Sequence, residues 1–123
     1  MVPHGSKEMS EERDGNPKHA EGRRKTPIRF IPPSALAAEG RVMELGASKY
    51  GAYNWSASGV SASIYYDAAM RHLMQWYTGE DTDPESGQPH LAHVRACMAI
   101  IIDAAALGML EDDRPKTAAF PPT

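Results

Sequence analysis

The chain has 123 residues, with 13 Lys or Arg against 16 Asp or Glu and a formal net charge of -3. This length is typical of one domain, and the slight excess of acidic residues argues against a protein built mainly to bind nucleic-acid backbone. The single cysteine, Cys97, excludes an internal disulfide and fits a reducing compartment, so we expect a cytoplasmic protein. No signal peptide is visible, and Arg95 and Asp103 interrupt the most apolar stretch, so we expect no membrane span.

Composition divides the chain into three parts. Residues 1–26 contain six Lys or Arg and five Asp or Glu with almost no apolar side chains, which predicts a disordered tail. Residues 111–123 contain three prolines and predict a flexible C-terminal tail. The folded domain should therefore lie within residues 27–110.

Three stretches of this domain have helical periodicity. The first helix is expected over 34–50, with Gly51 just beyond its end and Leu36, Gly40, Met43 and Ala47 as its buried stripe. The second is expected over 61–77 with a serine cap, and the third over 90–110. This pattern predicts an all-α fold, a small bundle of three to four helices. The third helix is apolar on nearly all sides, so we expect a homodimer or homotetramer to complete the bundle.

The second and third helices are joined by an acidic loop that carries Glu80, Asp81, Asp83 and Glu85. Four carboxylates in six residues repel one another, which indicates either a bound cation or strong exposure to water. An EF-hand is excluded because Gly87 falls at loop position seven and the twelfth position is alanine. A Mg²⁺ or Mn²⁺ ion that carries phosphates is one reading, and a solvated acidic turn is the other.

Basic and imidazole side chains flank this loop. Arg71 and His72 come before it, and His90 and His93 follow on one face of the third helix. His72 lies on an aromatic face, where a hydrogen-bonded core histidine is the alternative to a catalytic one. His90, His93 and Cys97 also raise a zinc site, but a structural zinc ion requires four ligands.

A second candidate group follows the first helix. Tyr50 and Trp55 could stack on a flat ligand, Asn54 could hydrogen-bond to its edge, and Lys49 could bind a phosphate. The alternative is that the two aromatic residues cap the core and Lys49 is solvated.

These motifs, taken in order, resemble a known family. They are Ile31-Pro32-Pro33, Gly46-Ala47-x-Lys49-Tyr50-Gly51-x-x-Asn54-Trp55, Arg71-His72-Leu73-x-x-Trp76, Gly79-Glu80-Asp81-x-Asp83-Pro84-Glu85-Ser86-Gly87 and His90-Leu91-x-His93. Residues 26–110 thereby resemble the dATP/dGTP diphosphohydrolase N-terminal domain family, which is common in bacteriophages.

The resemblance implies a fold similar to the MazG-like nucleotide pyrophosphohydrolases, which are oligomers. It also implies cleavage of a purine deoxynucleoside triphosphate to monophosphate and pyrophosphate with Mg²⁺ or Mn²⁺, in the host cytoplasm for a phage protein. Glu80, Asp81, Asp83 and Glu85 would supply metal ligands, and His90, His93, Arg71 and His72 would act in catalysis. Lys49, Tyr50, Asn54 and Trp55 would bind the substrate.

The chain also departs from the pattern of MazG-like enzymes. Those enzymes carry metal ligands as Glu-x-x-Glu and Glu-x-x-Asp on two helices, and neither motif is intact in the three helices here. His90-x-x-His93 stands where the second pair is expected. A non-catalytic nucleotide-binding or protein-interaction module is therefore the alternative function.

Overall fold

The structure is a computed structural model that describes residues 15–122, and it forms two units, Met1–Pro32 and Pro33–Thr123. In the first unit, helix α2 spans Pro17–Arg23 and a short 3₁₀ helix, η1, spans Ile28–Phe30. The Asn16 side chain accepts a hydrogen bond from the backbone N–H of Lys18 (3.0 Å), and Pro17 occupies the first turn. A helix start signal thus lies inside the segment expected to be disordered, although none of the α2 residues is buried.

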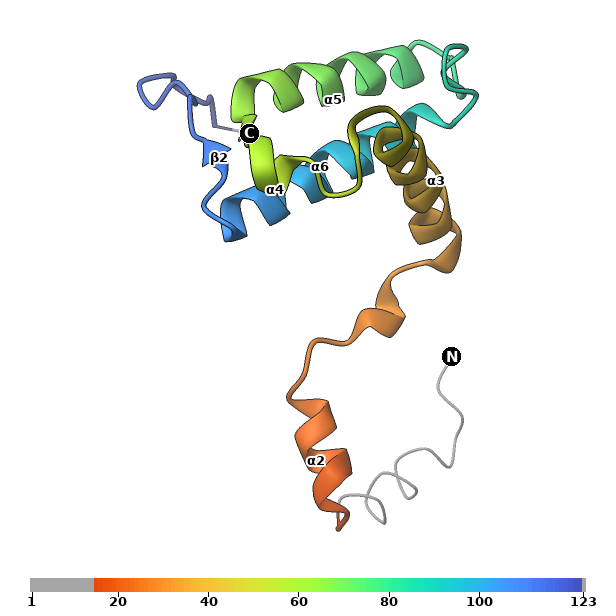
Figure 1. Cartoon of the computed structure of the whole chain (residues 1–123), viewed down its shortest axis with the longest axis vertical. Helices are drawn as coiled ribbons and strands as arrows, with labels where there is room; N and C mark the ends of the chain where they lie inside the picture. The colour runs from red at the N-terminus through yellow and green to blue at the C-terminus, as the bar shows by residue number, and fades with distance from the viewer. Residues whose placement is uncertain (1–14, 123) are drawn as a thin grey trace. The chain divides into compact units, whose positions relative to one another are not determined.

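The second unit confirms the three predicted helices and the all-α class. They are α3 (Pro33–Tyr50), α5 (Ala62–Tyr77) and α6 (His90–Ala106). Helices α5 and α6 lie side by side and run in opposite directions (Figure 1). Helix α3 packs against α6 near the loop that joins α5 to α6 (Figure 1). Gly51 adopts φ 90° and its N–H donates to the Ala47 carbonyl (2.9 Å), which is the predicted end of α3.

Two expected boundaries are wrong. A short helix, α4 (Trp55–Ser58), occupies part of the predicted loop, and α6 ends at Ala106 rather than near residue 110. Gly108 adopts φ 70°, a left-handed conformation that ends the helix and turns the chain. The turn allows β2 (Leu110–Glu111) to pair in parallel with β1 (Val60–Ser61), Val60 opposite Leu110.

The core between the helices is built mainly from small side chains. The buried apolar positions among the described residues are Val42, Trp55, Ala62, Ala69, Ala92, Ala96 and Ala104. Alanine at these positions lets helix backbones approach closely. The predicted stripe of α3 is only partly right: Leu36 is exposed, whereas Val42 is buried.

Several large apolar side chains of α5 and α6 are exposed. Ile64, Tyr66, Met74, Tyr77 and Ile102 are each more than half exposed. Exposed apolar area of this kind is typical of surfaces that contact another chain. Oligomerisation remains a prediction. None of the helices in the described part of the chain combines the length and apolarity needed to cross a membrane.

Residues at the start of the expected C-terminal tail make specific contacts with α5. The carboxylate of Asp113 accepts hydrogen bonds from the backbone N–H of Ser63 (2.8 Å) and from its hydroxyl. Ser61 occupies the predicted cap position, but its hydroxyl donates to the Glu111 carboxylate (3.0 Å). The start of α5 is therefore capped by a residue fifty positions away, which local sequence does not reveal.

Gly59→Ala should destabilise the protein by more than about 1 kcal/mol. Gly59 has φ +73°, and an added Cβ would lie 3.0 Å from the Met109 carbonyl oxygen, at the point where β1 and β2 meet. Gly40→Ala is the matched control, since Gly40 is helical with open space around it and alanine there should stabilise by up to about 1 kcal/mol. Urea unfolding of both variants measures the two effects. Equal stability of the variants would contradict this account.

Candidate functional site

The acidic loop between α5 and α6 is folded on itself by backbone hydrogen bonds. The N–H of Asp83 donates to the Gln88 carbonyl (2.9 Å), and the N–H of Gly87 donates to the Asp83 carbonyl (2.8 Å). The N–H of His90 donates to the Asp81 carbonyl (2.9 Å), which ties the first residue of α6 to the loop. These bonds fix the side chains of Asp83 and Ser86 beside the first turn of α6.

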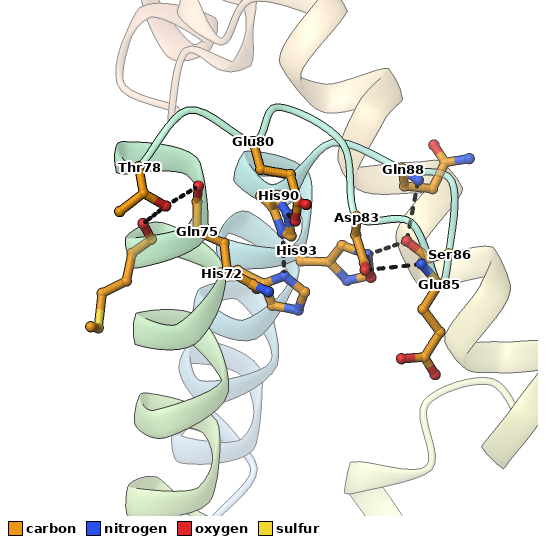
Figure 2. A network of polar contacts seen from close by, with 11 residues as sticks. His72, Gln75, Thr78, Glu80, Asp83, Glu85, Ser86, Gln88, His90 and His93 are labelled. Carbon is orange, nitrogen blue, oxygen red and sulfur yellow. Dashed lines mark hydrogen bonds and ion pairs between the residues drawn. The ribbon is translucent and has the colours of Figure 1, made fainter.

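Two histidines and one aspartate converge at this point (Figure 2). His72 comes from α5, Asp83 from the loop and His93 from α6, and one potential ligand atom of each lies within 4.8 Å of the others. The His72 and His93 rings stack with centroids 4.3 Å apart. His93 Nε2 lies 2.7 Å from Ser86 Oγ and 3.5 Å from Asp83 Oδ2. We call these three residues the His-Asp cluster.

A chain of hydrogen bonds runs from Glu80 through His90 to His72 of the cluster. His90 is fully buried, with its Nε2 2.6 Å from Glu80 Oε1 and its Nδ1 2.9 Å from His72 Nδ1. An ionised Glu80 only accepts, so Nε2 of His90 carries a proton. In a neutral His90, Nδ1 is then the acceptor, and Nδ1 of His72 donates to it. The remaining nitrogen of His72, Nε2, is left with a free lone pair.

The electrostatics of the cluster favour neutral imidazoles. Burial lowers the pKa of His72, and the neighbouring His93 lowers it further. Burial also lowers the pKa of His93, more strongly than Asp83 raises it. Burial opposes ionisation of Asp83, but hydrogen bonds from the Glu85 N–H and the Ser86 hydroxyl outweigh it and hold the Asp83 pKa below its usual value. Near neutral pH the cluster therefore offers two neutral imidazoles and a carboxylate, which is the state that metal ions bind.

A pocket of about 770 Å³ opens beside the cluster. His72, Ser86 and His93 line one part of it, and Lys49, Asn54 and Asp103 are among the other lining residues. Its walls come from the end of α3, the segment through α4, and the facing sides of α5 and α6. The pocket thus joins the two histidines of the His-Asp cluster to the second group of residues, those predicted to bind substrate.

The four predicted carboxylate ligands do not converge. Asp83 alone joins the His-Asp cluster. Glu80 is bonded to His90, and Asp81 is exposed. Glu85 is exposed and contributes its backbone N–H to Asp83, while its carboxylate points away from the histidines (Figure 2). The loop hydrogen bonds turn alternate side chains in different directions, and sequence spacing does not show this.

The predicted substrate-binding residues, by contrast, all line the one pocket. Lys49 and Tyr50 are exposed at its surface, Asn54 is half-buried, and Trp55 is buried. The expectation that Tyr50 and Trp55 both cap the core therefore holds only for Trp55. Arg71 is exposed and is not among the pocket residues.

Two further pocket residues were not among the predicted site residues. Ser86 lies within hydrogen-bonding distance of His93, and Asp103 accepts a hydrogen bond from the Trp55 indole N–H (2.7 Å). A carboxylate inside a strongly apolar helix was a usable signal for Asp103, because such groups are seldom placed there without a partner. Ser86 gave no comparable signal, since its role depends on how the loop folds.

The donor set of the His-Asp cluster can hold a divalent metal ion. Two neutral imidazoles and one carboxylate suit Mn²⁺, Fe²⁺ or Zn²⁺, whereas Mg²⁺ prefers oxygen ligands. Cys97, considered as a zinc ligand, is not part of the cluster, and burial raises its thiol pKa. Of the predicted ions, Mn²⁺ therefore fits the residues present better than Mg²⁺.

The lowered pKa values of His72 and His93 predict a specific acid sensitivity. Both groups bind protons more readily in the unfolded chain, so metal-free protein should lose stability as the pH falls below the ordinary histidine value of 6.5 toward the native values. Thermal melts in EDTA between about pH 8 and about pH 5 should show Tm falling by several degrees. A His72→Gln, His93→Gln double variant should show a flatter profile. If Tm falls equally with pH in both proteins, groups other than His72 and His93 cause the loss of stability.

Comparison with known proteins agrees with the motifs. Residues 15–114 match the family described as dATP/dGTP diphosphohydrolase, N-terminal. The chain is also 32% identical over 97 residues to a protein of Salmonella phage PMBT28 named dATP/dGTP diphosphohydrolase. That match covers 79% of this chain but 33% of the relative, so the chain spans about a third of the relative's length. No solved structure gives a significant match. The chain belongs to the dATP/dGTP diphosphohydrolase N-terminal domain family.

Proposed function

We propose that the chain hydrolyses a purine deoxynucleoside triphosphate, dGTP or dATP, to the monophosphate and pyrophosphate with a divalent metal ion. One observation carries the proposal: His72 and His93 of the His-Asp cluster line the same pocket as the four residues predicted to bind substrate. The family and the name of the phage relative support the same class of chemistry. We place this reaction in the host cytoplasm, where it would change the nucleotide pool during infection.

His72, Asp83 and His93 would hold the metal ion. A divalent ion at this position supplies charge neutralisation for phosphate oxygens and lowers the pKa of water. The surrounding residues would keep His72 and His93 neutral and Asp83 ionised, and they would fix the orientation of these three side chains. Glu80 and His90 set the proton position on His72, and Ser86 restrains His93.

The rest of the pocket would bind and orient the nucleotide. Lys49 is the cation among the pocket residues and would bind a phosphate group as a point charge. Tyr50 is 70% exposed and free to cover one face of a base, while the buried Trp55 forms part of the wall. Arg71, exposed outside the pocket lining, would act on the phosphates only through movement of its side chain.

We also propose a homodimer or homotetramer. The exposed apolar side chains of α5 and α6 supply a surface that a second copy would cover. A partner's residues could then complete a site in which the described chain contributes a single carboxylate to the cluster.

Turnover of purified protein tests the activity directly. We expect purine deoxynucleoside triphosphates to give monophosphate and pyrophosphate, with Mn²⁺ more effective than Mg²⁺ because imidazole ligands favour it. Chromatography of the products across the common nucleoside triphosphates, with each metal, measures substrate and bond cleaved. Folded, metal-loaded protein that leaves every nucleotide intact would favour the alternative, a nucleotide-binding module without catalysis.

Substitution of two carboxylates in the same loop tests whether Asp83, and not the nearby Glu85, is needed for activity. Asp83→Asn should lower kcat/KM by at least about 100-fold, because it removes the only carboxylate of the His-Asp cluster. Glu85→Gln should keep nearly full activity, because its carboxylate points away. Steady-state kinetics with matched Mn²⁺ titrations distinguishes lost metal affinity from lost turnover. The reverse ranking would move the metal site to Glu85.

A further inference from the structure

Asp103 is a charged residue at an otherwise apolar position of α6. It follows Ile100, Ile101 and Ile102 and precedes Ala104, which is fully buried. The Asp103 side chain is half-buried and lines the pocket. A carboxylate in such surroundings lowers the stability of the fold unless hydrogen-bond donors compensate it.

Residues of the protein use only part of the hydrogen-bond acceptor capacity of the Asp103 carboxylate. Oδ2 of Asp103 accepts a hydrogen bond from Nε1 of Trp55 (2.7 Å). Among the described residues, Asp103 has no second hydrogen-bond donor and no cation within ion-pair distance. A carboxylate has about four acceptor positions on its two oxygens. Most of that capacity is therefore available to a ligand in the pocket.

The position of Asp103 relative to the His-Asp cluster matches the length of a nucleotide. His93 and Asp103 both lie on α6, ten residues apart, which corresponds to about 15 Å along the helix. This separation is comparable with the span from the base to the terminal phosphates of an extended nucleoside triphosphate. With phosphates at the His-Asp cluster, the base would lie at the Asp103 end of the same pocket.

We propose that Asp103 is the residue that determines base specificity and that it selects guanine. This inference rests on the proposed function for the placement of the phosphates. The Watson–Crick edge of guanine presents two adjacent donors, N1–H and the N2 amino group, which a carboxylate accepts as a pair. Adenine presents an unprotonated N1 at that edge, which repels a carboxylate, and donates only from its 6-amino group. The Trp55 indole holds the carboxylate in place for this readout.

Binding of deoxynucleoside monophosphates without metal tests this selection independently of turnover. Calorimetry should show dGMP binding roughly 10- to 100-fold more tightly than dAMP. dIMP, which lacks the 2-amino group, should fall between them. Asp103→Asn replaces one acceptor oxygen with a donor, so it should reduce the dGMP to dAMP ratio to about one or invert it.

Trp55→Phe removes the indole donor but keeps the carboxylate, so it tests the positioning role of Trp55. The preference for dGMP should fall but should stay above one, because both oxygens of Asp103 can still accept from guanine. A lower Tm of Asp103→Asn with an unchanged dGMP to dAMP ratio would show that Asp103 has only a structural role and would overturn the inference. Should Asp103→Asn fail to fold, the series dGMP, dIMP and dAMP on the unaltered protein still tests the inference. Equal affinities across that series would overturn it, even if dGTP and dATP are both hydrolysed. Selective dGMP binding without turnover would support Asp103 and reject only the proposed hydrolysis.

Discussion

The fully buried ring of His90 connects the parts of the site. It begins α6, its backbone N–H is bonded to the acidic loop, and its two ring nitrogens contact Glu80 and His72. A buried imidazole requires partners for both nitrogens, so the loop, α5 and α6 can take only one relative arrangement there. The His-Asp cluster is assembled because this arrangement is fixed. Its three residues therefore come from three segments of the chain and still lie close together.

Small side chains on α6 set its distance from the neighbouring helices. Ala92, Ala96 and Ala104 are buried along α6, which permits close contact with its neighbours without filling the space between them. Helix α3 is held by two polar contacts, Glu39 with Arg95 (3.1 Å) and the Nε–H of Arg41 donating to Gln88 (3.2 Å). Glu39 thus serves to hold α3 against α6.

Apolar periodicity was enough to predict the three main helices. It failed where distant residues decide the local structure: Asp113 caps α5, and pairing of β1 with β2 follows the left-handed turn at Gly108. The same division holds in the site. Residue types and motif order singled out His72, His90, His93 and the acidic loop, which the structure brings close together. They did not distinguish Asp83, which joins the cluster, from Glu85, whose side chain points away.

The sequence by itself therefore determined the family, the all-α class and the segments that contribute to the site. These depend on local periodicity, turn residues and motif order, which are properties of the linear chain. Only the tertiary structure decided which carboxylate meets the histidines, and that Lys49, Asn54 and Asp103 line the same pocket. Side-chain direction in a folded loop and contacts between distant helices depend on three-dimensional packing, which spacing along the chain does not encode.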